Sequence, residues 1–312
     1  PEVLDLDATD GTALSGLERL YDRRSAWPEL VDVLRRRAAL ESSADMRREL
    51  YLRVARIFEG QIHNVDEAIF AYRQVNDEGE PSREALEARA RLFSAAERWQ
   101  DLLEVDEALE PLLTDDQARA DMLFQTGELL RTRLDNPQRA VEVLGDALVI
   151  DSAHEGARGA LTALLESPVR LQAIAILRPH YEEEGNYEAL LRCAEIEAAE
   201  LDDPLERSKV LRAASEVAEV GLENPAQAFD LLGRALRYGT TSPDLPALLD
   251  GLERLAERTD AQDKLLDLYR EVAPDLLDAA LQVRCNLRVA SIAENAFGDL
   301  KVAREHYVKV LD

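Results

Sequence analysis

The chain repeats two alternating kinds of segment along its length, and this repetition constrains its fold more than any other feature. In the first kind, an aromatic residue or its equivalent is followed three positions later by leucine. These pairs are Trp27 with Leu30, Trp99 with Leu102, Tyr187 with Leu190, and Gln262 with Leu265; six residues before them stand Tyr21, Phe93, Tyr181 and Ala256. A pattern that holds its register this long indicates one supersecondary unit used repeatedly.

In the second kind of segment, a capping residue precedes a helix that carries alanine four positions later. These pairs are Asn64 with Ala68, Asn136 with Ala140, Asn224 with Ala228, and Asp299 with Ala303. Asparagine at an N-cap accepts hydrogen bonds from free amides of the first turn, and Pro137 and Pro225 follow it at N1, where no donor is missed. Successive alanines lie 72, 88 and 75 residues apart, so each double unit is predicted to hold two hairpins of roughly 34 to 37 residues.

Apolar residues recur three and four positions apart within the predicted helices, as in Leu50, Val54, Ile57 and Phe58, which gives each helix one apolar stripe. The longest interval has a surplus between Asp151 and Pro168, where Gly156 to Glu166 is predicted to form an additional short helix. We therefore expect an all-α solenoid of about 17 helices, arranged as eight hairpins plus one extra helix. Its double units are expected at 13–80, 82–153, 154–240 and 243–312, as a single array.

Composition supports a long-helix protein and disfavours two classes of partner. Charged residues make up 32% of the chain and the hydrophobic set 46%, while Gly (14) and Pro (12) are sparse. The formal charge of −26 repels phosphate backbones and anionic lipid. No stretch approaches the roughly 20 apolar residues of a membrane helix. We expect no nucleic-acid partner and no membrane insertion.

The two cysteines and the chain ends bear on location and completeness. Cys193 and Cys285 form no CxxC motif and are predicted to be small buried hydrophobes, which fits a reducing cytoplasm best, with the periplasm left open. The chain begins at Pro1, residues 1–12 resemble the tail of a preceding loop, and Val302 to Leu311 forms a last helix with no capping helix. We expect a fragment of a longer protein that either self-associates through an uncapped terminal helix or gains stability when the array is extended.

The pattern resembles the tetratricopeptide repeat family across nearly the whole chain, most closely the long Arg-, Leu- and Ala-rich arrays of GC-rich bacteria. Its aromatic at the end of the first helix matches Tyr21, Phe58, Phe93 and Tyr181, its small turn residue matches Gly185, and its small packing residue matches Ala68, Ala140, Ala228 and Ala303. No unit carries the full Trp, Leu-Gly, Tyr signature. The resemblance implies a right-handed superhelix whose first helices line a concave groove that receives partner proteins or peptides.

Six groove-facing positions on each first helix follow from this resemblance, and twelve of these residues are basic while fourteen are acidic. We hypothesise that the groove binds a ligand of mixed charge, and the candidate binding residues are Arg53, Arg56, Arg131, Lys209, Arg212, Arg284 and Arg288. The alternative is that these charges pair with one another between adjacent repeats and bind nothing. Only Asn295 matches the Lys and Asn clamp of chaperone-tail binders, which argues against that subfamily.

The sequence offers no catalytic, metal or cofactor site. It contains no GxxxxGK[ST], GxGxxG or GxSxG motif. His63, His154, His180 and His306 are scattered without a second His or Cys at helical spacing, so structural or surface roles are predicted for them. Trp27 and Trp99 are predicted to pack within hairpins.

The sequence therefore predicts a non-catalytic scaffold for protein–protein interaction. Two alternatives stay open: the regulatory arm of a larger enzyme, for example one fused to a kinase, and a structural spacer or self-assembling array.

Overall fold

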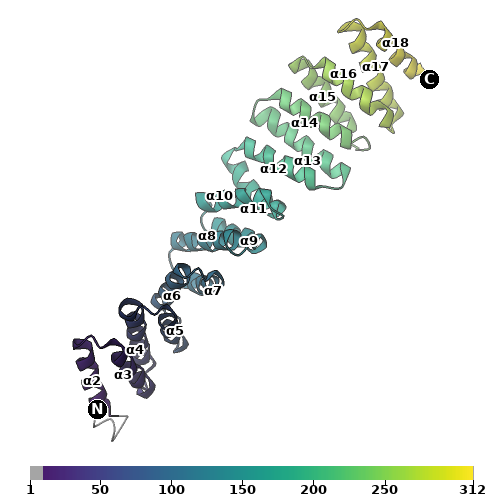
Figure 1. Cartoon of the computed structure of the whole chain (residues 1–312). Coiled ribbons are helices and arrows are strands. Elements are labelled where there is room, and N and C mark those ends of the chain that lie inside the picture. The colour runs from purple at the N-terminus through teal and green to yellow at the C-terminus, as the bar shows by residue number, and fades with distance from the viewer. Residues whose placement is uncertain (1–9, 312) are drawn as a thin grey trace. The chain divides into compact units, whose positions relative to one another are not determined.

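The computed structural model describes residues 10–311, which form helices joined by short turns and contain no strand (Figure 1). Seventeen α-helices lie in this range, as the sequence predicts. The first nine are α2 (Gly11–Arg23), α3 (Trp27–Leu40), α4 (Ala44–Ile57), α5 (Val65–Asp77), α6 (Arg83–Ala95), α7 (Trp99–Leu109), α8 (Asp116–Thr132), α9 (Pro137–Ile150) and α10 (Glu155–Ala163). The others are α11 (Arg170–Glu184), α12 (Tyr187–Glu200), α13 (Pro204–Glu216), α14 (Pro225–Tyr238), α15 (Leu245–Thr259), α16 (Gln262–Val272), α17 (Ala279–Asn295) and α18 (Leu300–Leu311).

The chain divides into two compact units, residues 1–163 and 164–312. The described part of the first holds the hairpins α2–α3, α4–α5, α6–α7 and α8–α9 together with α10, which packs on α8 and α9. The second holds α11–α12, α13–α14, α15–α16 and α17–α18. The eight hairpins and the single extra helix thus form tetratricopeptide-like helical repeats.

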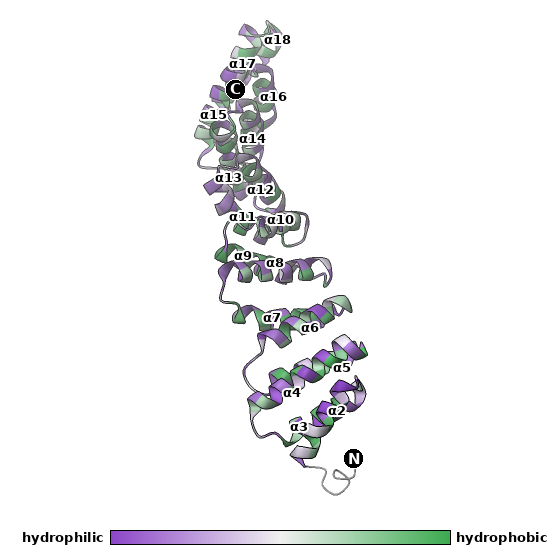
Figure 2. Cartoon of the chain, turned by 90° about the vertical axis from the view of Figure 1, so that its left-hand side faces the viewer, coloured by the Kyte–Doolittle hydropathy of each residue, from purple (hydrophilic) through white to green (hydrophobic). Residues whose placement is uncertain are grey.

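Each hairpin buries the apolar stripes that the sequence predicts, while polar residues cover the rest of each helix (Figure 2). Leu50, Val54, Ile57 and Phe58 are all buried in a cluster that runs through α3 to α7. A second cluster joins α12 to α18. Because each stripe is covered by its neighbours in sequence, stability comes from contacts between adjacent elements.

The first kind of segment forms hairpins that close with one left-handed residue. The amides of Ala26, Arg98, Asn186 and Ala261 donate to the carbonyls of Tyr21, Phe93, Tyr181 and Ala256, each five residues earlier. The residue before each donor has positive φ; these are Ser25, Glu97, Gly185 and Asp260. The turn residue predicted at Gly185 is confirmed, and the same conformation is imposed on three residues that are not glycine.

Hairpins of the second kind hold one more residue in the turn. The amides of Asn64, Asn136, Asn224 and Asp299 donate to carbonyls six residues earlier, on Phe58, Leu130, Ala218 and Ala293. Positive φ again marks the residue before the donor, at His63, Asp135, Glu223 and Gly298. In two hairpins the extra residue widens the end of the first helix into a π-helical turn, Phe58–Ile62 after α4 and Val217–Gly221 after α13.

The predicted caps are confirmed. Asn64, Asn136 and Asn224 accept from amides three residues later, and Asp299 from the amides of Lys301 and Val302. Helices α9 and α14 begin at Pro137 and Pro225.

Two boundaries differ from the sequence expectation. Gly11 and Thr12, expected in a loop, begin α2, because the Asp10 carboxylate accepts from the amides of Thr12 and Ala13 and caps that helix. Residues 1–9, also expected in that loop, lie outside the described part of the chain. The extra helix begins at Glu155, one residue before the predicted start, and ends in a 3₁₀ turn over Leu164–Glu166.

Candidate protein-binding surface

All the candidate residues lie on the first helix of a hairpin. We call the surface that these first helices form the first-helix surface. In the first unit α4 carries Arg53 and Arg56, and α8 carries Arg131. In the second unit Lys209 and Arg212 lie on α13, and Arg284 and Arg288 lie on α17. We describe the two units separately.

Arg53 joins two neighbouring first helices in the first unit. Its guanidinium forms an ion pair with Glu18 and lies 3.4 Å from the Asp22 carboxylate, both on α2. Glu18 also pairs with Arg37 on α3, and its side chain is only 14% exposed. A carboxylate shared by two arginines and shielded from water holds its partners more firmly than an open surface pair does.

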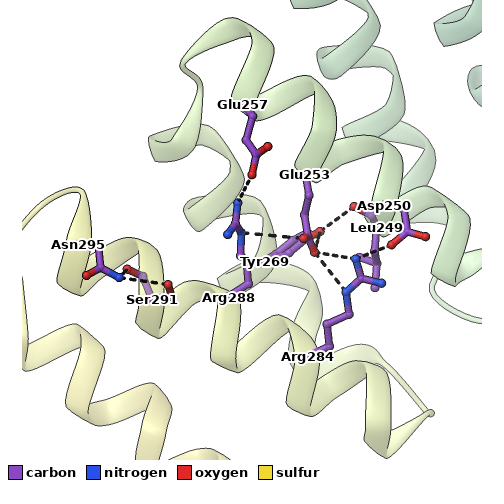
Figure 3. Close-up of polar contacts among 9 residues, drawn as sticks. All are labelled: Leu249, Asp250, Glu253, Glu257, Tyr269, Arg284, Arg288, Ser291 and Asn295. Atoms are coloured by element: carbon purple, nitrogen blue, oxygen red, sulfur yellow. Dashed lines mark hydrogen bonds and ion pairs between the residues drawn. The ribbon is translucent and has the colours of Figure 1, made fainter.

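A second clamp joins α15 and α17 in the second unit (Figure 3). Arg284 lies 2.6 Å from Asp250 and 2.9 Å from Glu253. Arg288 lies 3.0 Å from Glu257 and 4.0 Å from Glu253. Glu253 is therefore the centre of the clamp, with Arg284 and Arg288 on either side of it.

The hydroxyl of Tyr269 lies 3.3 Å from the Glu253 carboxylate and 3.2 Å from the carbonyl of Leu249 (Figure 3). Tyr269 is fully buried, and burial raises the pKa of its phenol. The hydroxyl therefore stays protonated and donates to these acceptors. The clamp is tied in this way to the core of the α15–α16 hairpin.

The remaining candidates also have acidic partners. Arg56 pairs with Glu84 on α6, and Arg212 lies 2.8 Å from Asp244, the residue that precedes α15. Arg131 and Lys209 pair within their own helices, with Glu128 and Glu206, each at 2.7 Å. All seven candidates are thus paired with carboxylates of the chain itself, five of them across hairpins. This arrangement agrees with the alternative that the charges satisfy one another, and ligand binding by the seven stays a prediction.

Glu219 follows α13, at the end of the first helix of its hairpin. Here the acidic residue lies on the earlier hairpin and its basic partners lie on the next one. Glu219 accepts hydrogen bonds from Arg254 and Arg258 on α15, one of them at 2.8 Å from Arg254. The bond from Arg254 holds the pKa of Glu219 below its ordinary value. Ion pairs of this kind between hairpins restrict how adjacent repeats can slide.

One region of the first-helix surface is hollowed. A cavity of about 390 Å³ opens between α11, α12 and α13 in the second unit. Leu190 and Ala194 of α12 and Val210 and Val217 of α13 are among the apolar residues that line it. The charged lining residues are Arg178, Glu182 and Glu197, and Tyr187 adds an aromatic ring.

Only one ion pair forms among the charged side chains that line this cavity. Arg178 and Glu197 pair with each other. Within the described residues, the Glu182 carboxylate makes no hydrogen bond or ion pair, and Glu182 is exposed. The cavity therefore combines an apolar floor with an unpaired negative charge.

A shallower depression of about 470 Å³ lies beside the clamp on α17. Val283 and Leu287 line it and are 37% and 42% exposed, next to Arg284 and Arg288. The depression thus places two exposed apolar side chains beside charges that are already paired.

Sequence reasoning missed the lining of the 390 Å³ cavity. Tyr187 was noted only as an equivalent of Trp27 and Trp99, and its ring packs against Gly221 of the next hairpin, where a β-carbon would come within 2.5 Å of the ring. The same tyrosine is 40% exposed and lines the cavity. The available signal was small residues, such as Ala213 and Ala194, at repeat positions that carry large ones elsewhere.

Two histidines and both cysteines contribute to packing or to hydrogen bonds within the fold. His306 is buried with its Nδ1 2.8 Å from the Asn286 side chain, and His154 accepts from the Ala157 amide at the start of α10. Cys193 and Cys285 are buried, and burial raises the pKa of the Cys285 thiol to about 12. Over residues 10–311, no three His, Cys, Asp or Glu side chains gather as metal ligands would, and no helix is long and apolar enough to cross a bilayer.

Comparison with known proteins gives likeness only among solved structures. No family model and no curated protein matches the chain. A tetratricopeptide repeat protein from Parabacteroides merdae is 14% identical, with 78% of this chain and 100% of that one covered and a TM-score of 0.35. YrrB, described as a TPR protein with an unusual peptide-binding site, is 16% identical over 65% and 91% of the chains, with a TM-score of 0.28. The TPR2AB domain of yeast Sti1 in complex with pHSP90 is 11% identical over 86% and 98%, with a TM-score of 0.31. At such low TM-scores, the tetratricopeptide-like description rests on the hairpins of this chain.

Proposed function

We propose that this chain is a non-catalytic module that binds a partner protein or peptide through its first-helix surface. The observation that carries the proposal is the cavity between α11, α12 and α13, where an apolar floor and an unpaired carboxylate open on this surface. Interfaces commonly combine a desolvated apolar centre with a few placed charges. The exposed Val283 and Leu287 beside the α17 clamp extend apolar contact area over the same surface.

The seven paired basic residues have a different role in this proposal. Five of them pair across hairpins, and in the second unit the pairs of Arg212, Arg284 and Arg288 fix neighbouring hairpins against each other, so that the cavity and the depression keep their shape. A rigid site loses less conformational entropy when it binds, and this favours affinity.

Photocrosslinking tests which surface meets a partner. A benzophenone amino acid is placed at Leu287 on the first-helix surface, and in a matched variant at Val149, which is 85% exposed on the second helix α9. In cells that naturally produce the protein, we expect Leu287 to crosslink a discrete partner that Val149 does not. Equal crosslinking from both positions, or crosslinking from Val149 alone, would contradict the proposal.

A further inference from the structure

The cavity between α11, α12 and α13 has counterparts elsewhere in the chain that are already filled. All four double units, α2–α5, α6–α9, α11–α14 and α15–α18, have the same turn hydrogen bonds at matching positions. The third helix of each is capped by a side chain at a matching position, on Ser43, Asp115, Asp203 and Asp278. The double units can therefore be compared residue for residue.

In two of the four double units, an arginine stands at the position that Ala213 holds beside the cavity. Arg53 reaches Glu18 and Asp22 in the first, and Arg288 reaches Glu253 and Glu257 in the last. These two arginines stand at matching positions, and so do the two pairs of carboxylates. The chain thus uses the same guanidinium site twice.

The other two double units lack this arginine. In α6–α9 its position holds Gln125, and Ala90 and Ser94 replace the two carboxylates. In α11–α14 Ala213 stands at the arginine position, Arg178 at the position of Glu18, and Glu182 at the position of Asp22, so a carboxylate remains without the arginine. Arg178 pairs with Glu197, which reproduces the pair between Glu18 and Arg37 with the signs exchanged.

After this exchange, the side chains that line the cavity carry a net charge of −1. Arg178 balances one of the two carboxylates that line the cavity, Glu182 and Glu197, and leaves one negative charge. That charge lies on Glu182, the carboxylate without a partner among the described residues.

The floor of the cavity also consists of smaller residues than its counterparts. Ala194 stands where the first double unit has Leu34 and the last has Tyr269, both fully buried. Ala214, another lining residue, stands where the first double unit has Val54 and the last has Val289, both fully buried. The space is therefore wide enough to accept a side chain from outside.

We propose that this cavity binds an arginine side chain of a partner protein, which takes the place that Arg53 and Arg288 fill elsewhere. The aliphatic stem lies on Leu190, Ala194 and Val210, and the guanidinium pairs with Glu182. The proposal deepens the proposed function and rests on it, because it names the chemistry of the partner.

The aromatic lining residue fits the same ligand. Tyr187 matches Trp99 in the repeat, and the guanidinium of Arg133 lies over the Trp99 ring at 5.0 Å. A ring at this position thus stacks with a guanidinium in α6–α9; Gly221 stands in place of Arg133 in α11–α14, and Tyr187, 40% exposed, is left without an arginine from the described part of the chain on its ring.

Methyl NMR of the whole chain, titrated with N-acetylarginine methylamide, tests the proposal directly. The corresponding citrulline compound, a neutral isostere, is the control ligand. We expect saturable shifts of the Ala194, Ala213 and Val210 methyl groups with the arginine compound and little response to citrulline. Glu182→Gln should weaken binding about threefold to tenfold, whereas Glu183→Gln, next to it but outside the cavity lining, should not.

A second variant closes the cavity from within. Ala213→Arg rebuilds the arginine of the first and last double units, so it should fold, unfold at least as late as the parent chain, and no longer bind the arginine compound. Equal binding of citrulline, no effect of Glu182→Gln, or shifts confined to other methyl groups would overturn the inference. These results leave the Leu287 crosslink untouched, so failure of this site is distinguishable from failure of the proposed function.

Discussion

Arg53 and Arg288 hold matching positions in the first and last double units, and each contacts two carboxylates of the preceding first helix. The same contact thus recurs in two of the four double units, where it braces neighbouring first helices. The other two have Gln125 and Ala213 at this position, and only the one with Ala213 keeps a carboxylate, Glu182, where the arginine's partner would be.

Removing the charge of Glu253 tests how much the clamp stabilises the second unit. Glu253 is shared by Arg284, Arg288 and Tyr269, and its side chain is 23% exposed. We expect Glu253→Gln to lower the free energy of unfolding by about 1 to 2 kcal/mol, measured by urea denaturation. The matched change Glu257→Gln, at a side chain 66% exposed, should cost less than about 0.5 kcal/mol. Equal costs would show that Glu253 has no central role.

Asp106 makes stability depend on pH. It is a buried carboxyl on α7, and burial followed by the nearby charge of Glu107 raises its pKa to about 6. Because the folded pKa lies above that of the unfolded chain, this group favours folding most below about pH 4, and the benefit is lost as the pH rises through 6.

The substitution that tests this pH dependence is Asp106→Asn, which removes the buried charge. At pH 7 we expect it to raise the free energy of unfolding by roughly 2 to 3 kcal/mol, with a smaller gain at pH 4, in thermal or urea unfolding. Glu104→Gln, an exposed acid on the same helix, is the control. A gain that does not change with pH would contradict the assignment to Asp106.

Adding a glycine at one left-handed turn position and removing it at another should have opposite effects on the melting temperature. Glu97 has φ of 54° and Gly185 has φ of 65° at matching turns. Left-handed backbone costs a residue with a β-carbon about 1 kcal/mol more than it costs glycine. Glu97→Gly should therefore raise the melting temperature and Gly185→Ala should lower it, as calorimetry would show. The same direction for both variants would rule out backbone conformation as the cause.

Exposed apolar residues of α18 predict self-association of the chain. Val308 and Leu311 are 45% and 86% exposed on this helix. We expect light scattering to detect a concentration-dependent dimer that Val308→Lys combined with Leu311→Lys abolishes. Val149→Lys, on another exposed apolar residue, should leave it intact. A monomer at all concentrations would refute this expectation.

The hairpins could be predicted from sequence because their signals are local. Asn64 and Asn224 are caps that act within one helical turn, and Tyr21 and Tyr181 lie a fixed distance before their turns. The number of helices, the extra helix after Asp151 and the buried stripes follow from the same short-range rules. Spacing along the chain was enough to find them.

The site was harder to predict because it depends on differences between repeats. The register correctly placed Arg53 and Arg288 on first helices, but it could not show which carboxylates they contact. The cavity arises from Ala194 and Ala213, residues that are unremarkable in themselves and informative only beside their larger counterparts. Glu182 is unpaired because Arg178 stands where the first double unit has Glu18 and pairs with Glu197 instead. This change of charge involves side chains of different helices.

The uniform turn closure also bears on how such a chain can change in evolution. Each of the eight hairpins closes with a single left-handed residue before the next cap, so the joints between segments are chemically alike. A recombination event that deletes or duplicates a whole double unit would rejoin the chain at a compatible joint. The gene can thus lengthen or shorten by full modules, and a specialised module such as α11–α14 can diverge while the copies beside it preserve the frame.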